Sequence, residues 1–317
     1  VITDLVAQLE TDPRTHPVPP EQTTLAFWDA MEKLVRIGAP AVPHLLGGLD
    51  DPLRDRLRAR RMMTLERIGP DATLPLTRAL RSPSRMLRQN VAILLGRIGE
   101  QAGDARAVGH LLQRWEDPEE LPEVKEAVSE ALVKITGRVP ATLRPAKTHL
   151  LELAEQFYYG ESLSVASRLL SDPKGHLAQV WVWRAEEGHP QGGRIAPLDL
   201  MTYESPDGWS KAGFVPAFAY NELMAEEALY DALRSDPSYE PAVALLVCAT
   251  LAQTLEVENL LQTQAATAAP RPAETAYLEG RRQDLRKARM LALAAGPRIL
   301  HQALLRAVRD GDVGLGQ

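Results

Sequence analysis

The sequence has few of the residues that build cross-linked, aromatic-rich or membrane-embedded proteins. Its single cysteine, Cys248, excludes an internal disulfide framework and any multi-cysteine zinc or iron–sulfur site. Aromatic residues make up only 5% of the 317 residues, and the apolar content comes mainly from alanine, leucine and valine, which favours packed helices over a β-sandwich. No uninterrupted apolar run approaches the roughly 18 residues that a membrane span needs. We therefore expect a mostly α-helical chain without a membrane span.

The sequence also lacks the residue patterns of common active sites. The seven histidines form no pair at metal-ligand spacing, no Gly-x-Ser-x-Gly occurs, and the glycines at 188, 192 and 193 match neither phosphate-loop spacing. Cys248 lies in an apolar run with no base nearby in the sequence, which predicts a buried, inert thiol. The acidic run 116–120 lacks the residue order of a calcium loop. These absences predict no catalytic residue, no metal site and no cofactor.

What the sequence does contain is an internal repeat. An Ile-Gly pair recurs at Ile37, Ile68 and Ile98, at steps of 31 and 30 residues, and Ile135 follows 37 residues later. A period of this length predicts a helical-repeat array. Three residues before each isoleucine stands a leucine and one residue before it a base: Leu34, Leu65, Leu95 and Leu132, with Arg36, Arg67, Arg97 and Lys134. Such a pattern is typical of helices that end at the following glycine, here Gly38, Gly69 and Gly99.

A second helix is expected after each of these glycines. Its apolar positions keep one register in three successive units: Leu45, Leu46 and Leu49; Leu76, Thr77 and Leu80; Leu111, Leu112 and Trp115. Each stretch ends before Pro52, Pro83 or Pro118, because proline cannot continue a helix but can open the next one. Each unit is thus a helical hairpin of about 30 residues, which is too small to bury its own apolar face and must stack on its neighbours.

The inter-helix stretches 67–72 (RIGPDA) and 36–43 (RIGAPAVP) resemble the signature of HEAT repeats, in the short form found in phycobilisome lyases and their bacterial relatives. The resemblance covers roughly residues 22–138 and implies an α-solenoid of stacked helical hairpins. Bilin lyases of this group attach a chromophore on such a scaffold. Only scaffold positions match in this chain, so the resemblance carries over no catalytic residue.

The repeat pattern divides the chain into five predicted segments. They are the end of a preceding repeat with a linker (1–20), HEAT-like repeats (21–138), a helical segment (139–261), an Ala/Thr/Pro-rich linker (262–273) and C-terminal helices that start further repeats (274–317). In the third segment, the spacing of Ala225, Leu229, Ala232 and Pro237 resembles the second helix of a tetratricopeptide repeat. In the last segment, basic residues such as Arg281 are expected on the solvent side. The chain itself is expected to be a segment of a larger protein.

A small β-hairpin is expected within the third segment, at about 178–202. The stretch 180–184 is β-prone, the glycine-rich run 187–193 predicts a turn, and 194–201 predicts a second strand. In a strand, Trp181 and Trp183 point to the same face. That face either covers a helix or forms an aromatic binding ledge, together with Tyr203 and Trp209 of the following loop.

Charge is unevenly distributed. The chain holds 36 basic and 42 acidic residues, a net charge of −6, but residues 52–114 hold 13 arginines and only 5 acidic residues. Arg58, Arg88 and Lys125 lie ten residues before successive marker isoleucines and form a ladder of cations. This ladder is either a solvated surface whose arginine stems cover apolar side chains or a docking face for an acidic partner. The acidic flanks and the lack of interleaved aromatic residues argue against nucleic acid.

Together these patterns predict a non-enzymatic α-solenoid scaffold that mediates protein–protein interaction within a larger bacterial assembly. Two alternatives stay open: a repeat-scaffolded enzyme or small-ligand binder, bilin-lyase-like, that uses the aromatic insertion, and a nucleic-acid backbone binder that uses the arginine-rich repeats. One cysteine and no visible signal sequence predict a cytoplasmic location. The candidate partner-binding residues are Arg54, Arg58, Arg61, Arg85, Arg88, Lys125, Trp181, Trp183, Tyr203 and Trp209.

Overall fold

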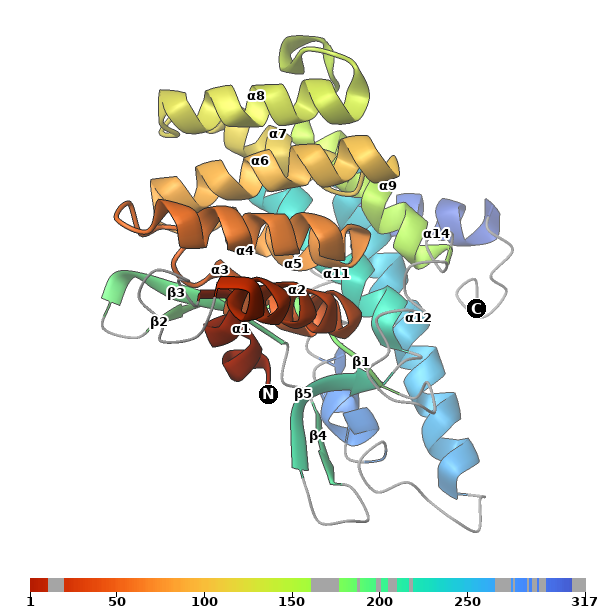
Figure 1. Ribbon diagram of the computed structural model, residues 1–317. Helices are drawn as coiled ribbons and strands as arrows, with labels where there is room; N and C mark the ends of the chain where they lie inside the picture. Colours follow the sequence, from red (N-terminus) through yellow and green to blue (C-terminus); the bar gives the residue numbers. More distant parts are fainter. Residues whose placement is uncertain are drawn as a thin grey trace. The chain divides into compact units, whose positions relative to one another are not determined.

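In the computed structural model, the chain is mostly helical (Figure 1). The structure describes residues 1–10, 20–160, 177–186, 189–197, 201–204, 210–216 and 219–265, and beyond these 275, 277–283, 285–286, 290 and 295–309. The chain divides into two compact units. Unit 1 comprises Val1–Ala146 and Trp181–Ala196, and unit 2 comprises Lys147–Val180 and Pro197–Gln317.

Unit 1 consists of helix pairs and a β-hairpin. The first helix of each pair is long, and these helices are α2 (Pro20–Ile37), α4 (Asp55–Ile68), α6 (Arg85–Ala102) and α8 (Pro122–Thr136). The second helices are shorter: α3 (Val42–Leu46), which follows the 3-10 turn η1 (Ala39–Ala41), α5 (Pro70–Ala79) and α7 (Val108–Glu116). Helix α1 (Ile2–Glu10) packs on α2, and a second 3-10 turn, η2 (Pro140–Thr142), follows α8. In Figure 1, α2, α4, α6 and α8 lie side by side, each in contact with the next.

The apolar positions of the repeat pack in the interfaces between these helices. The four marker leucines, Leu34, Leu65, Leu95 and Leu132, are at most 1% exposed. Of the marker isoleucines, those at 68 and 98 are buried and those at 37 and 135 are half-buried. Each fully buried side chain of this size stabilises the folded chain by about 1.5–3 kcal/mol relative to exposure. The apolar residues that recur with the repeat period therefore face the neighbouring helices, as predicted.

Glycines end most of these helices, with one correction. Gly38 and Gly69 follow α2 and α4 with φ of 72° and 69° and ψ of −138°, a conformation that side chains with a Cβ rarely adopt. The prediction that α6 ends at Gly99 is wrong. Because residues 100–102 (Glu-Gln-Ala) are strong helix formers, α6 continues to Ala102 and ends at Gly103, whose φ of 66° and ψ of 27° form a left-handed cap.

Gly99 instead allows α6 to approach α8 closely. A Cβ added at Gly99 would lie 2.5 Å from Cγ1 of Ile135, and one added at Gly96 would lie 2.8 Å from Cα of Ala131. These distances are far below ordinary van der Waals contact. The two glycines on α6 therefore set the spacing between α6 and α8.

The predicted β-hairpin is present, with shifted strand bounds. Strand β2 (Trp181–Glu186) pairs with β3 (His189–Pro197), and β2 packs against α5. The expected turn at 187–193 and second strand at 194–201 are wrong in detail, because Gly192 and Gly193 lie inside β3, while Gly188 lies outside the described residues. A Cβ added at Gly193 would come within 2.5 Å of the Trp183 indole. The indole therefore fills the side-chain space of the glycine, which lets a glycine-rich run continue as a strand.

Unit 2 contains the helices α9 (Ala146–Tyr158), α11 (Tyr220–Ser235), α12 (Glu240–Ala265) and α14 (Pro297–Arg309), with further helical residues at 277–283. The first residue of α9, Ala146, belongs to unit 1. Helix α12 packs against α11 and α14. An antiparallel sheet in the order β1-β5-β4, which the sequence analysis does not predict, is built from β1 (Leu177–Ala178), β5 (Ser210–Pro216) and β4 (Met201–Glu204). Strands β1 and β4 have only two and four residues, and β5 (SKAGFVP) contains a glycine and ends in proline, so none of the three gives a clear strand pattern in the sequence.

Helix α12 is longer than its sequence suggests. It runs through residue 265, so the first residues of the predicted linker 262–273 are helical, while 266–273 lie outside the described residues. Among the helices that the structure describes, α12 is the one whose length and composition could cross a membrane, with a mean hydropathy of 1.3 over Glu240–Thr263. Its packing against two neighbouring helices gives an ordinary reason for this apolar composition. The absence of a membrane span stays a prediction.

Gly96→Ala and Gly99→Ala are each expected to lower the free energy of unfolding by about 1–3 kcal/mol, because the added methyl group overpacks the interface between α6 and α8. Urea denaturation followed by circular dichroism measures this change. Gly280→Ala is the matched control, because Gly280 is helical and no atom lies within 4 Å of its added Cβ. The free energy of unfolding of the control should rise by up to about 1 kcal/mol, because alanine has a higher helix propensity than glycine. A similar gain in all three variants would contradict the close approach of α6 and α8.

Candidate functional site

Two rungs of the predicted cation ladder, Arg58 and Arg88, bind the loops that precede their own helices. Nη1 of Arg58 donates to the carbonyl oxygen of Asp51 at 3.0 Å, and Nη1 of Arg88 donates to that of Ser82 at 2.7 Å. Their side chains are only 22% and 11% exposed. These two guanidinium groups therefore hold loop backbone inside unit 1.

Arg88 also forms a bidentate pair with Glu120, which lies just before α8. Nε donates to Oε2 at 2.8 Å and Nη2 donates to Oε1 at 2.6 Å, and the Glu120 side chain is only 1% exposed. Burial alone would raise the pKa of Glu120, but the hydrogen bonds from Arg88 hold this pKa below its ordinary value. The pair therefore connects α6 to the loop in front of the next long helix.

The other four predicted cations have different surroundings. Arg61 pairs with Glu10 of α1, and its side chain is 12% exposed. Arg54 and Arg85 are exposed, and each lies near one carboxylate, at 3.2 and 3.9 Å. Lys125 is half-buried and forms no ion pair with a described residue. The six cations therefore do not share one kind of environment.

The four predicted aromatic residues are divided between the units. Trp181 is 5% exposed on β2, the strand that packs against α5, and Trp183 is half-buried beside Gly193. Tyr203 lies on β4 of unit 2, and Trp209 lies outside the described residues. The two tryptophans of β2 lie on one strand of unit 1.

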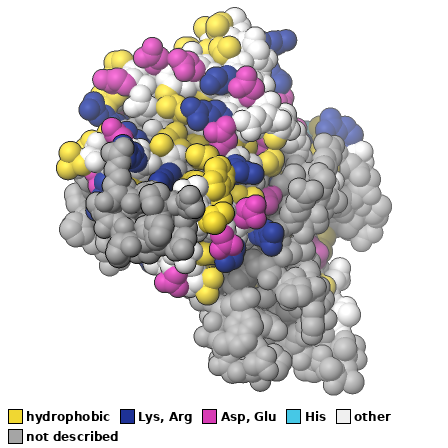
Figure 2. Space-filling view, in the orientation of Figure 1, with side chains coloured by type: hydrophobic (Ala, Val, Ile, Leu, Met, Phe, Trp, Pro, Cys, Tyr) yellow, Lys and Arg dark blue, Asp and Glu magenta, His cyan; other side chains and the backbone are white. Residues whose placement is uncertain are grey.

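The bases that precede the marker isoleucines lie at the surface. Arg36, Arg67 and Lys134 are exposed in the last turns of α2, α4 and α8, and Arg97 is exposed on α6 before its last turn. Cations are favoured there because the carboxyl end of a helix carries partial negative charge. Figure 2 looks onto these four helices and shows hydrophobic side chains at the surface among the charged ones.

A groove of about 410 Å³ lies between the C-terminal ends of α4 and α6. Ile68 and Ile98 line it and are 7% and 1% exposed, so they form an apolar floor. Met63, which is 40% exposed, and Ala102 lie higher on its walls. Ala102 belongs to the turn of α6 beyond Gly99, so the unpredicted extension of α6 builds one side of this groove.

The charged side chains at the rim of the groove fall into two groups. Glu66 accepts a hydrogen bond from Nε2 of Gln101 at 2.7 Å and pairs with Nη1 of Arg97 at 3.2 Å, so both of its oxygens are occupied. Arg67 forms no ion pair with any residue that the structure describes. Its guanidinium lies 5.9 Å from the ring centre of Trp28, which is 43% exposed.

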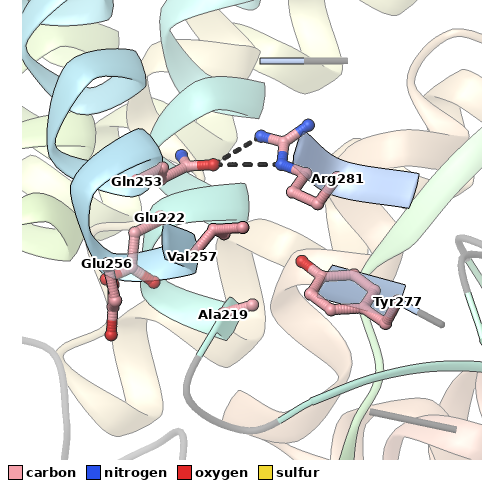
Figure 3. Close-up of a pocket in the computed structure, with 7 residues that line it drawn as sticks. All are labelled: Ala219, Glu222, Gln253, Glu256, Val257, Tyr277 and Arg281. Carbon is pink, nitrogen blue, oxygen red and sulfur yellow. Dashed lines mark hydrogen bonds between the residues drawn. The ribbon is translucent and has the colours of Figure 1, made fainter. Parts of the chain in front are cut away.

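Unit 2 contains a buried charged cluster that the sequence analysis missed. Glu226 of α11 accepts hydrogen bonds from Nε2 of Gln253 at 2.7 Å and from Nη2 of Arg281 at 2.5 Å. Arg281 also donates to Oε1 of Gln253, as the dashed lines in Figure 3 show. The prediction that Arg281 faces solvent is wrong. Its side chain is 15% exposed because it compensates the buried carboxylate of Glu226.

Glu222, one turn before Glu226, lies in the same cluster without such compensation. Its Oε2 atom is buried and has no hydrogen-bond partner among the described residues. The pKa of Glu222 is raised to about 7, mainly by burial; a hydrogen bond from its own backbone opposes the rise, the charges of Glu256 and Glu226 contribute to it, and Arg281 opposes it. The space between these side chains, with about 10 Å³ for the centre of a water molecule, suits a single water and no organic ligand.

Comparison of the chain with protein-family models, with curated proteins and with solved structures found no match. Among the described residues, no group of three or more His, Cys, Asp or Glu side chains could hold a metal ion. Cys248 is buried as expected, and its Sγ donates to the carbonyl oxygen of Ala303 at 3.3 Å. The absence of a cofactor stays a prediction.

Arg88→Met is expected to lower the free energy of unfolding by about 3 kcal/mol, because the buried carboxylate of Glu120 loses its bidentate partner and keeps only the amide of Leu121 and Arg114, whose Nη1 lies 3.6 Å away. Urea denaturation measures the loss. The double variant Arg88→Met/Glu120→Leu removes both charges and should recover much of the stability. If the single variant is as stable as the unchanged chain, the pair does not connect α6 to the loop before α8.

The stability of unit 2 is expected to fall as the pH rises from about 4.5 to about 7. The folded state keeps the proton of Glu222 in this range, whereas the unfolded chain has already released it. Hydrogen–deuterium exchange of α11 and α12, corrected for the intrinsic effect of pH on exchange, measures the change. Glu222→Gln should flatten the pH dependence, and Glu258→Gln, at an exposed position on α12, should leave it unchanged. Equal pH profiles for all three chains would contradict the buried proton.

Proposed function

We propose that unit 1 is an α-solenoid of HEAT-like helical hairpins of the short repeat type, and that it is a non-enzymatic scaffold for protein–protein interaction in a larger assembly. The succession of contacts from α2 to α4, α6 and α8 supports this architecture. So do the matching glycine conformations at Gly38 and Gly69, which repeat one backbone turn in consecutive units. Repeat arrays of this kind present long surfaces rather than deep pockets.

The observation that carries the proposal is the set of apolar side chains left exposed on two adjacent helices. Leu25 and Trp28 of α2 are 69% and 43% exposed, and Met63 of α4 is 40% exposed. A single exposed apolar side chain is ordinary. Here Met63 lines the groove and the ring of Trp28 lies against Arg67 at its rim, so two helices in contact present apolar side chains at one groove, which is typical of a protein interaction surface.

The alternative functions find less support in the described residues. Arg58, Arg61 and Arg88 are 22%, 12% and 11% exposed and bind groups of the same chain, so they offer little to a phosphate backbone. Trp181 is buried, so it offers little surface to a small ligand. The surface of α2 and α4 therefore remains the best candidate for function.

Site-specific photo-cross-linking in the native cell tests the proposal. A photoreactive residue placed at Trp28 or Met63 of the full chain should capture one partner protein. The same residue at Leu53, which is 92% exposed before the opposite end of α4, is the matched control and should not capture it. The captured protein, once purified, should bind Met63→Glu about tenfold or more weakly than the unchanged chain, because a buried charge would remain without a partner.

Two results would contradict this function. One is equal capture from the Leu53 control position. The other is a purified partner whose affinity is unchanged by Met63→Glu, provided that circular dichroism shows the variant to be folded.

A further inference from the structure

We infer that the groove between α4 and α6 binds an acidic peptide segment of the partner protein, with one apolar side chain on the floor and a carboxylate on Arg67. This inference rests on the proposed function and deepens it, because it states the chemistry of the bound segment. It uses three observations: the size of the groove, its apolar floor and the surroundings of Arg67.

The size of the groove fixes how much of the partner it holds. Sites of about 300–1,000 Å³ enclose one drug-sized molecule. At about 410 Å³, the groove takes one or two side chains and not a whole helix. Met63, which is 40% exposed, offers apolar surface above the floor made by Ile68 and Ile98, and burial of this surface favours a large apolar side chain. The bound segment is therefore short and has one apolar anchor.

The positive charge of Arg67 at the rim favours a bound segment that carries an acidic residue next to its apolar anchor. The charge of Glu66 is offset by Arg97, and Gln101 donates to its other oxygen, so Glu66 does not repel a second carboxylate strongly. Arg67 has no carboxylate among the described residues, and the ring of Trp28 lies beneath its guanidinium. A planar guanidinium in a fixed position favours bidentate binding of a carboxylate.

Two other occupants fit the groove less well. A nucleic acid would bring phosphates to Arg67 but no aliphatic group for the floor made by Ile68 and Ile98. A second copy of the chain that bound through the same face would place its own exposed Arg36 and Arg67 against those of the first copy, and these like charges repel. An acidic, partly apolar peptide satisfies both parts of the site.

Selection of short random peptides displayed on phage against the full chain tests the inference. The enriched peptides should combine Asp or Glu with one large apolar residue. Synthetic copies, followed by fluorescence anisotropy, should bind Arg67→Gln about tenfold or more weakly, because charge-assisted hydrogen bonds are lost. Arg36→Gln is the matched control, because it removes an equivalent exposed charge one helix away from the groove and should leave the affinity unchanged.

The outcomes separate this inference from the proposed function. Peptides without acidic residues, equal losses in both variants, or no enriched peptide would overturn the acidic groove. Dimers in sedimentation that Arg67→Gln dissociates would identify a second copy as the occupant and would also overturn it. If the cross-linked partner binds Arg67→Gln as tightly as the unchanged chain, the scaffold function stands and the acidic groove does not.

Discussion

Unit 1 depends on one constraint: a helical hairpin of about 30 residues cannot bury its own apolar face. The marker leucines satisfy this constraint only because the next long helix lies against them. The spacing between helices then follows from what stands at the contact, as Gly96 and Gly99 show where α6 meets α8. Polar contacts such as Arg88 with Glu120 add connections between neighbouring units, but the apolar interfaces come first.

The periodic part of the fold could be predicted because burial leaves a regular trace in the sequence. A leucine, a base and an isoleucine at fixed offsets located α2, α4 and α8 and their buried faces. The same rule failed at Gly99, where a residue that usually ends a helix serves interhelical packing instead. Only the distance to Ile135 on another helix reveals this role, and no local pattern contains it.

The candidate sites were harder to predict, because the role of a charged residue depends on partners far away in the sequence. Arg58, Arg67 and Arg88 look alike in the chain, yet Arg67 reaches the surface while the others hold loops. Glu222 and Glu226, four residues apart on one face of α11, could have signalled a buried cluster. The compensating cation at position 281 lies 55 residues beyond Glu226, so no spacing rule connects them.

The extra turn of α6 affects the position along the proposed scaffold at which a partner binds. A strictly periodic surface offers equivalent binding positions at every step, and a ligand could slide from one to the next. The three residues after Gly99 occur in one unit and have no counterpart after Gly38 or Gly69. On the proposed scaffold this irregularity distinguishes one binding position from the others. A partner that binds beside the extra turn of α6 is therefore held in one register along the array.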